Sequence, residues 1–440
     1  MITNISGFPE FLPNEQLIFE RIVKIIRNEF ELYNFLPLDT SAIERNSTLL
    51  AKGNDNEIYG IYRLADKDGM SSKELGMRFD LTVPLARYVS QNYGQLIFPY
   101  RRYHIAPVWR GERPQAGRYR QFYQADIDVI GDGKLDEMHD AEIISIMCRI
   151  FTKIGINNFT VKINDRGLLS IILKHFGIID NYMLEAIRIV DKMEKISSEE
   201  FSKQLSLVGM SVEGINIINS WRDKDLSNKE WFVYLGELIK DNEELNEKLL
   251  SIARLISDSI KFGAKEENIN IDPKLARGLT YYTGIVCETT LGDYPKIGSI
   301  CSGGRYDNLA DNFTNKKLPG VGMSIGLSRL VHTLIEEGFF LPQGTTIAKV
   351  MVSTQNRALM ERYISIAADL RQAGISTELY LINKPLGQQL KYASKKGFRY
   401  CIIADDLEFD RNIVILRNLD EGTQQNLSMI DLIEILKASI

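Results

Sequence analysis

The sequence predicts a protein of the α/β class, built from two to three domains in which helices and strands are mixed. Three stretches carry this prediction. Residues 101–131 read as two strands joined by an arginine-rich loop, the chain becomes charged and helical from about Gly167 to Lys265, and strands alternate with helices from residue 343. A length of 440 residues, 44% of them hydrophobic and 25% charged, is typical of a globular protein of this size.

The first predicted element is an amphipathic helix with Asn14 as its N-cap and its end near Tyr33. Apolar residues recur through it at helical spacing, namely Leu17, Ile18, Ile22, Ile25, Ile26 and Phe30. Such a helix is expected to pack one face against the rest of the protein.

The run MRFDLTVPLARYVS contains a second candidate element. Arg78, Asp80 and Thr82 share one face of a short predicted strand, which Pro84 ends before a helix begins. An aspartate two residues from a threonine can bind an ammonium group through charge and hydrogen bonding. An aspartate that caps a turn or a helix explains the same pattern, so both interpretations stay open.

The segment RRYHIAPVWRGERPQAGRYRQFYQADIDVIG, from Arg101 to Gly131, carries most of the predicted chemistry. Strand alternation places polar and aromatic side chains on one face of its second half, namely Arg118, Arg120, Phe122, Gln124, Asp126 and Asp128. The opposite face is half apolar and can pack on helices. The segment therefore predicts a ligand site, with a solvated ladder of cross-strand ion pairs as the alternative.

The helical stretch and the C-terminal stretch carry weaker signals. Charge runs such as KMEKISSEEFSKQL are those of a solvated helical subdomain and have no specificity of their own. Alternating strands and helices after residue 343 predict a small α/β domain with a largely parallel sheet. Its basic cluster is either a solvated patch or an RNA contact, and consists of Lys391, Lys395, Lys396 and Arg399.

Several classes of protein are excluded or disfavoured. No run of 18 or more apolar residues and no basic leader occur, so neither a membrane span nor an export signal is expected. The four cysteines lack CxxC spacing, which argues against zinc and disulfides and fits a reducing cytoplasm. A net charge of -5 gives no overall attraction to nucleic acid. The run GVGMSIG lacks the spacing of a dinucleotide fingerprint, and no Walker A sequence is present.

The segment from Arg101 to Gly131 resembles motif 2 of the class II aminoacyl-tRNA synthetases, and specifically that of the histidyl-tRNA synthetases. The histidine signature of this family resembles LARGLTYYTGIVCET, and the segment that follows the signature resembles SGGRYDNL. Motif 3 is similar to PGVGMSIGLSRL, and motif 1 resembles residues 15–45. This resemblance implies a catalytic domain at 1–166 and 268–340 with an antiparallel sheet flanked by helices. It also implies a helical insertion at 167–267 and an anticodon-binding domain at 343–440.

The resemblance also implies a role for individual residues. ATP would be held by Arg110, Glu112, Arg118, Phe122, Arg277 and Arg329, of which Arg110, Glu112, Arg277 and Arg329 would be catalytic and Phe122 would stack on adenine. Histidine would be bound by Asp80, Leu81, Thr82, Gln124, Asp128, Tyr281 and Tyr282. Gln115 would inspect the tRNA acceptor end. Mg2+ would accompany ATP, coordinated mostly by phosphate and water rather than by a protein cage, and no tightly bound cofactor is expected.

The expected activity is ATP-dependent ligation of L-histidine to tRNA(His) by a cytoplasmic homodimer without membrane contact. Ser41 and Thr280 depart from the family pattern, which has proline and aspartate at these positions. The alternative is a non-catalytic histidine sensor resembling the regulatory subunit of ATP phosphoribosyltransferase. That paralog lacks the C-terminal α/β domain and tends to lose the phosphate-binding arginines, so retention of Arg110, Arg277 and Arg329 favours the ligase.

Overall fold

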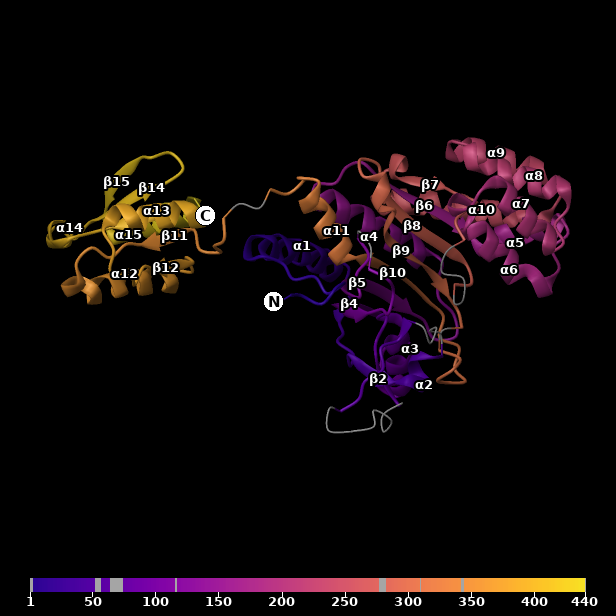
Figure 1. Ribbon diagram of the computed structural model, residues 1–440, viewed down its shortest axis with the longest axis horizontal. Coiled ribbons are helices and arrows are strands. Elements are labelled where there is room, and N and C mark those ends of the chain that lie inside the picture. Colours follow the sequence, from indigo (N-terminus) through magenta and orange to yellow (C-terminus); the bar gives the residue numbers. More distant parts are fainter. Residues whose placement is uncertain are drawn as a thin grey trace. The chain divides into compact units, whose positions relative to one another are not determined.

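The computed structural model describes residues 3–51, 57–63, 74–114, 117–276, 282–308, 310–341 and 344–439 (Figure 1). These residues form two compact units. The larger unit comprises Met1–Pro9 and Ile22–Glu336, and the smaller comprises Glu10–Arg21 and Glu337–Ile440. The mixed α/β class predicted from the sequence is confirmed.

An eight-stranded sheet forms the centre of the larger unit. Its strands lie in the order β1 (Leu36–Pro37), β4 (Tyr100–Trp109), β5 (Gln121–Ile130), β10 (Gly320–Gly326), β9 (Ser299–Tyr306), β8 (Ile285–Leu291), β6 (Phe159–Asp165) and β7 (Ile269–Ile271). The short edge strands β1 and β7 run parallel to their neighbours, and every other pair is antiparallel. The predicted antiparallel sheet is therefore confirmed.

Helices cover one face of this sheet, as Figure 1 shows around β5 and β10. Helix α11 (Leu327–Glu336) packs on β5, and α4 (Met138–Ile154) packs on β10. The alternating residues Ala125, Ile127 and Val129 of β5 are fully buried on this side. The apolar half of the predicted strand thus packs on helices as expected, which leaves its polar face for a ligand.

The N-terminal helix α1 (Pro13–Leu32) begins one residue before the predicted N-cap Asn14. Proline is favoured at the first helical position, since its missing N–H would have no partner there. Ile22, Ile26 and Phe30 are buried, as the spacing predicted.

The strand predicted through Arg78 and Thr82 is wrong: β3 covers only Leu75–Met77, and α3 (Thr82–Gln91) begins at the threonine. Strand β2 (Ile43–Arg45) pairs with β3, and α2 (Asn46–Leu49) follows β2.

The predicted helical stretch forms helices α5 (Arg166–His175), α6 (Asp180–Asp191), α7 (Ser198–Leu207), α8 (Val212–Ser220), α9 (Asn228–Leu238) and α10 (Glu243–Lys261). The preceding strand ends at Asp165 rather than near Gly167, because the Asp165 carboxylate caps α5 by accepting hydrogen bonds from two backbone N–H groups. Helix α10 packs against both α4 and α5, so these helices are continuous with the sheet-bearing unit.

The C-terminal part contains a five-stranded sheet in the order β12 (Thr377–Leu379), β11 (Val350–Val352), β13 (Tyr400–Ile403), β14 (Val414–Asn418) and β15 (Gln424–Leu427). Its helices are α12 (Met360–Gln372), α13 (Leu386–Lys396), α14 (Asp406–Asp410) and α15 (Met429–Ser439). Only β12, β11 and β13 are parallel, so the prediction of a largely parallel sheet is half wrong. Most residues of β15 are polar and exposed, so the sequence gives no signal for a strand that pairs with β14.

Candidate active site

Two adjoining cavities lie on the face of the central sheet opposite α11 and α4, where α3 packs against Ile130 and Tyr306. We call the first, of about 240 Å³, the arginine cavity, since its lining includes Arg110, Glu112, Arg118, Phe122 and Arg329. We call the second, of about 210 Å³, the carboxylate cavity, since its lining includes Asp80, Thr82, Asp126, Asp128 and Tyr282. The cavities share the lining residues Arg110, Gln124, Ser302 and Ser324. A molecule in one cavity can therefore contact a molecule in the other.

Strand register explains why these side chains meet. On β5, the alternating residues Phe122, Gln124, Asp126 and Asp128 lie on this face, and the neighbouring strand β10 places glycine opposite Asp128. A Cβ at that glycine, Gly322, would lie 2.1 Å from Asp128 Oδ1. Gly322 thus leaves room for the Asp128 carboxylate, and Gly320, where a Cβ would lie 2.3 Å from the Tyr306 ring, lets Tyr306 reach that carboxylate from β9.

Backbone carbonyl groups orient two of the three arginines that line the arginine cavity. Arg110 Nε donates to the Phe79 carbonyl at 3.0 Å, and its guanidinium lies over the Phe122 ring, 5.0 Å from the centroid. Arg329 Nε donates to the Gly117 carbonyl and Nη1 to the Ser299 carbonyl, both at 2.8 Å. Two fixed cations beside an aromatic ring suit the phosphates and base of a nucleotide.

The loop before β5 contributes an ion pair that is longer and more exposed, between Arg118 and Glu112. Arg118 Nη1 lies 3.6 Å from Glu112 Oε2, and the Arg118 side chain is 53% exposed. Arg120 was predicted to share the chemical face, but it lines neither cavity, and its Nε donates to the Glu112 carbonyl. The alternation fails here because β5 begins only at Gln121.

Asp80 has one of the two roles that the sequence left open, that of a helix cap, and it lies in a cavity where the other role, ligand binding, is possible. Its Oδ1 accepts a hydrogen bond from the Val83 N–H at 3.1 Å, so it caps α3, and it also lines the carboxylate cavity beside Thr82. Burial raises the pKa of Asp80, and the neighbouring Arg110 and Arg102 oppose the shift. The Leu81 side chain is fully buried against Ala106 and Val108, so only its backbone is available to the site.

Asp128 is held by two buried partners that sequence reasoning did not identify. Tyr306 Oη donates to Asp128 Oδ1, and the fully buried Arg102 places Nη2 2.6 Å from Asp128 Oδ2. Arg102 Nη2 also donates to the Leu81 carbonyl at 3.1 Å, which joins β4 to the start of α3. Burial raises the pKa of Asp128 to about 6, although Arg102 and Tyr306 act in the opposite direction. Arg102 could have been found from the register, since it lies opposite Asp128.

Asp126 was placed on the chemical face but was not predicted to bind a ligand. It is only 2% exposed, and burial raises its pKa to about 7 against the effect of Arg102. His104 lies opposite Asp126 on β4, where burial and the nearby cations Arg102 and Arg78 lower its pKa to about 3. His104 is therefore neutral, and its Nε2 lies 3.0 Å from Asp39 Oδ1.

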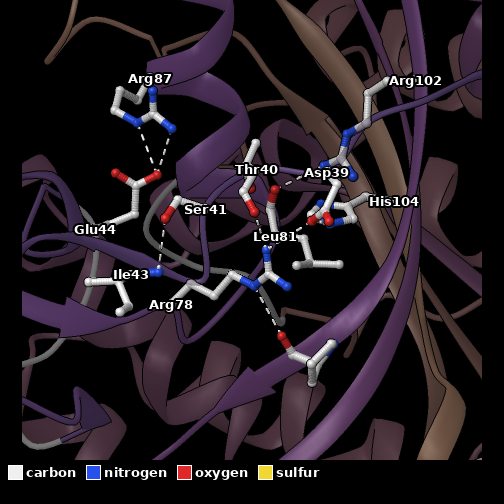
Figure 2. Close-up of polar contacts among 11 residues, drawn as sticks. Asp39, Thr40, Ser41, Ile43, Glu44, Arg78, Leu81, Arg87, Arg102 and His104 are labelled. Carbon is white, nitrogen blue, oxygen red and sulfur yellow. Dashed lines mark hydrogen bonds and ion pairs between the residues drawn. The ribbon is translucent and has the colours of Figure 1, made fainter. Parts of the chain in front are cut away.

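Figure 2 shows how Arg78 ties the loop around Ser41 to the sheet. Arg78 Nη1 donates to the Thr40 carbonyl at 2.6 Å, and Nε donates to the Pro107 carbonyl at 3.0 Å. Ser41, where the family pattern has proline, is exposed, and its Oγ accepts from the Ile43 N–H at 3.3 Å. The serine thus forms a local turn contact, and buried Arg78 fixes the path of the loop.

Four predicted residues lie outside the described part of the chain, namely Gln115, Arg277, Thr280 and Tyr281. Tyr282, next to them, lines the carboxylate cavity, and its carbonyl accepts from Arg166 Nη1 at 2.6 Å. Within the described residues, no group of three or more His, Cys, Asp or Glu side chains is placed to hold a metal ion. No helix in those same ranges is long and apolar enough to cross a membrane.

Two family models together match most of the chain. The family model "Histidyl-tRNA synthetase" matches residues 7–330, and the model "Anticodon binding domain" matches residues 349–439. The chain is 40% identical to the histidine–tRNA ligase of Clostridium tetani, over 98% of this chain and 97% of that protein. The crystal structure of histidyl-tRNA synthetase from Nostoc sp. PCC 7120 matches over 100% of both chains, with a TM-score of 0.90 and 35% identity.

A structure of an ATP phosphoribosyltransferase regulatory subunit/histidyl-tRNA synthetase from Bacillus halodurans is also similar. It covers 89% of this chain and 96% of its own, with a TM-score of 0.73 and 19% identity, and at that identity the likeness concerns the fold alone. The Clostridium tetani relative, which matches over nearly its full length, is a histidine–tRNA ligase, so the sensor alternative is less supported. The chain belongs to the histidyl-tRNA synthetase family.

Proposed function

We propose that the carboxylate cavity binds L-histidine and the arginine cavity binds ATP, so that the two substrates react where the cavities meet. Family membership makes the chain an aminoacyl-tRNA ligase. The observation that carries the proposal is the pair of cavities with opposite charge that share Arg110 and Gln124. The product of the first step would be histidyl-adenylate, with pyrophosphate as the leaving group.

The reaction needs positioning and charge neutralisation more than it needs a proton acceptor. A carboxylate is already a nucleophile, and the charge that grows on the phosphates must be opposed by cations held in place. As the family resemblance implies, Arg110, at the junction of the cavities, would bind the α-phosphate, and Arg329, in the arginine cavity, would bind the γ-phosphate. Arg277 remains a predicted second α-phosphate ligand.

Mg2+ fits this cavity as a companion of ATP. Glu112 is the carboxylate in the lining of the arginine cavity, and it faces a site that phosphates would fill. Bound Mg2+ would neutralise phosphate charge and keep most of its ligands as phosphate oxygens and water. Phe122 presents one ring face to Arg110, so adenine would stack on the remaining accessible surface of the ring.

The histidine site follows from the polar groups of the carboxylate cavity. Asp80 and Thr82 would bind the α-amino group, and Gln124, near Arg110, would bind the backbone of the amino acid. Asp128 and Tyr282 would bind the imidazole, with Tyr281 as a further predicted wall. Buried polar groups satisfied only by an imidazole reject apolar amino acids, by about 10^4 or more in favourable cases.

Transfer to tRNA(His) would follow, with attack of a terminal ribose hydroxyl on the adenylate and release of AMP. The anticodon-binding model at 349–439 supports a tRNA partner, and Gln115 remains a candidate reader of the acceptor end. In the C-terminal basic cluster, Lys396 lies 2.9 Å from Glu378, whereas Lys391 and Lys395 are exposed and better suited to phosphate contact.

A homodimer in the cytoplasm is the proposed state of the chain. The surface near the motif 1 region exposes apolar side chains, including Leu36 at 53% and Ile43 at 44%. Asp39 is 85% exposed although its partners Arg78 and His104 are buried. A second copy covering this surface would shield these groups, and sedimentation equilibrium would measure whether the chain is dimeric.

ATP–pyrophosphate exchange with each of the 20 amino acids tests the proposed function. Exchange with histidine alone, lost in Arg110→Ala and retained in Arg113→Ala, would support it. Arg113 is a matched control because it lies on the same loop but is exposed and lines neither cavity. Histidine binding without exchange in the wild type would instead support the sensor alternative.

A further inference from the structure

We propose that Asp126 is a second carboxylate for the substrate side chain, which together with Asp128 binds the imidazole ring with both ring nitrogens protonated. This inference rests on the proposed function, since it concerns how the carboxylate cavity recognises histidine. The roles derived above use Asp128 and leave Asp126, a buried acid in the same lining, without a task.

The position of Asp126 is that of a ligand-binding group. Its side chain is 2% exposed and lines the cavity, yet its Oδ1 has no hydrogen-bond partner among the described residues. A buried carboxylate oxygen without a donor costs free energy that a structural role would not explain. A ligand that brings an N–H group to this oxygen would remove the cost.

The spacing of the pair matches an imidazolium. Asp126 and Asp128 are two residues apart on one face of β5, which separates them by roughly 6.8 Å along the strand. A ring with two N–H groups pointing away from each other, each forming a hydrogen bond of about 2.9 Å, spans a similar distance between acceptors. Neutral imidazole has one N–H, and so could satisfy only one of the two carboxylates.

The charges around the pair also suit a cation. The acidic groups near Asp126 are Asp80, Asp128, Glu57, Cys301, Tyr282 and Tyr306, and the basic groups are Arg78, Arg102, His104 and Arg110. His104 is neutral, and Arg110 is needed for phosphate. The substrate ammonium group would offset Asp80, and a protonated ring would offset the second acid of the Asp126–Asp128 pair.

Isothermal titration of histidine at pH 8, in buffers with different ionisation enthalpies, measures the protons taken up on binding. Free imidazole is mostly neutral at this pH, with an ordinary pKa of about 6.5, so the wild type should take up close to one proton per histidine. Asp126→Asn should take up almost none and should raise the histidine KM in exchange about 10- to 100-fold, while the ATP KM stays unchanged. 2-Fluorohistidine, a weaker base, should be discriminated against by the wild type and less by the variant.

Asp132→Asn is the control, since Asp132 follows the same strand but is exposed and lines neither cavity. Thermal unfolding would show whether Asp126→Asn is folded, and proton uptake by the wild type tests the inference without any variant. Binding of histidine by the wild type without proton uptake would overturn the inference while leaving the proposed function intact. Absence of histidine-dependent exchange in the wild type would reject the proposed function itself.

Discussion

The two cavities share one sheet and four lining residues, yet they hold their charges differently. In the arginine cavity, Arg110 and Arg329 are partly exposed and are aimed by backbone carbonyl groups. In the carboxylate cavity, Asp126 and Asp128 are almost completely buried and depend on one buried cation, Arg102. One cavity keeps its charges partly hydrated, and the other has removed them from water.

This difference matches the two tasks proposed for the cavities. Phosphate binding requires strong fixed cations, and partial hydration costs little because the ligand itself carries several charges. Selection among amino acids requires polar groups that are left unsatisfied by a wrong side chain, and that penalty is large only where water is excluded. Burial of the acids in the carboxylate cavity therefore lowers the stability of the ligand-free protein and increases the selectivity between amino acids.

The largest expected effect comes from removing the buried cation Arg102 from beside the carboxylate cavity. Arg102→Met should lower the free energy of unfolding by about 3–5 kcal/mol, because Asp128 would be left buried without its cation. Denaturant unfolding at pH 8 measures the change. Arg101→Met is the matched control on the opposite face of β4, where the Arg101–Glu142 pair is partly exposed and a loss of about 1 kcal/mol is expected. Equal losses in the two variants would contradict the special role of Arg102.

The next effect concerns the arginine cavity. Arg329→Ala should lower the rate of ATP–pyrophosphate exchange about 100- to 1,000-fold, since a fixed cation that opposes growing phosphate charge is lost. Stability should change much less than in Arg102→Met. Calorimetric titration should still detect histidine binding, since Arg329 does not line the carboxylate cavity. Loss of histidine affinity in this variant would show that the two cavities are not separable.

The pH dependence of stability distinguishes the cavities further. Burial raises the folded-state pKa of Asp126 to about 7, whereas an unfolded aspartate has a pKa of about 3.9. The folded protein binds this proton more tightly, so the stability it contributes is lost as pH rises from about 4 to 7. Asp126→Asn should therefore be about 2–3 kcal/mol more stable than the wild type at pH 8, with no advantage near pH 4. A difference that is independent of pH would contradict this assignment.

The smallest effect is expected at the rim of the arginine cavity. Arg118 is more than half exposed, and its contact with Glu112 is long, so Arg118→Ala should raise the ATP KM only about three- to tenfold. The histidine KM should be unchanged, and Arg113→Ala again serves as the control in exchange assays. An effect of Arg118→Ala as large as that of Arg329→Ala would mean that the loop closes over ATP and buries the residue.

Much of the site could be predicted because a strand alternates its side chains. Alternation alone assigns Phe122, Gln124 and Asp128 to one face, and all three line the cavities. The same rule fails at Arg120, which precedes the first residue of the strand. Tyr306 could not be predicted, because β10 separates its strand from β5, and its ring crosses β10 at Gly320, where a side chain would block it.

The sequence by itself determined the family, the side chains that share one face of β5 and most of the helices, because periodicity and local motifs depend on neighbours along the chain. Only the tertiary structure decided which charges are buried together. Arg102, Asp128 and Tyr306 come from three different strands, and their meeting sets the desolvation that raises the aspartate pKa. Desolvation depends on everything that surrounds a group in space, which no local pattern records.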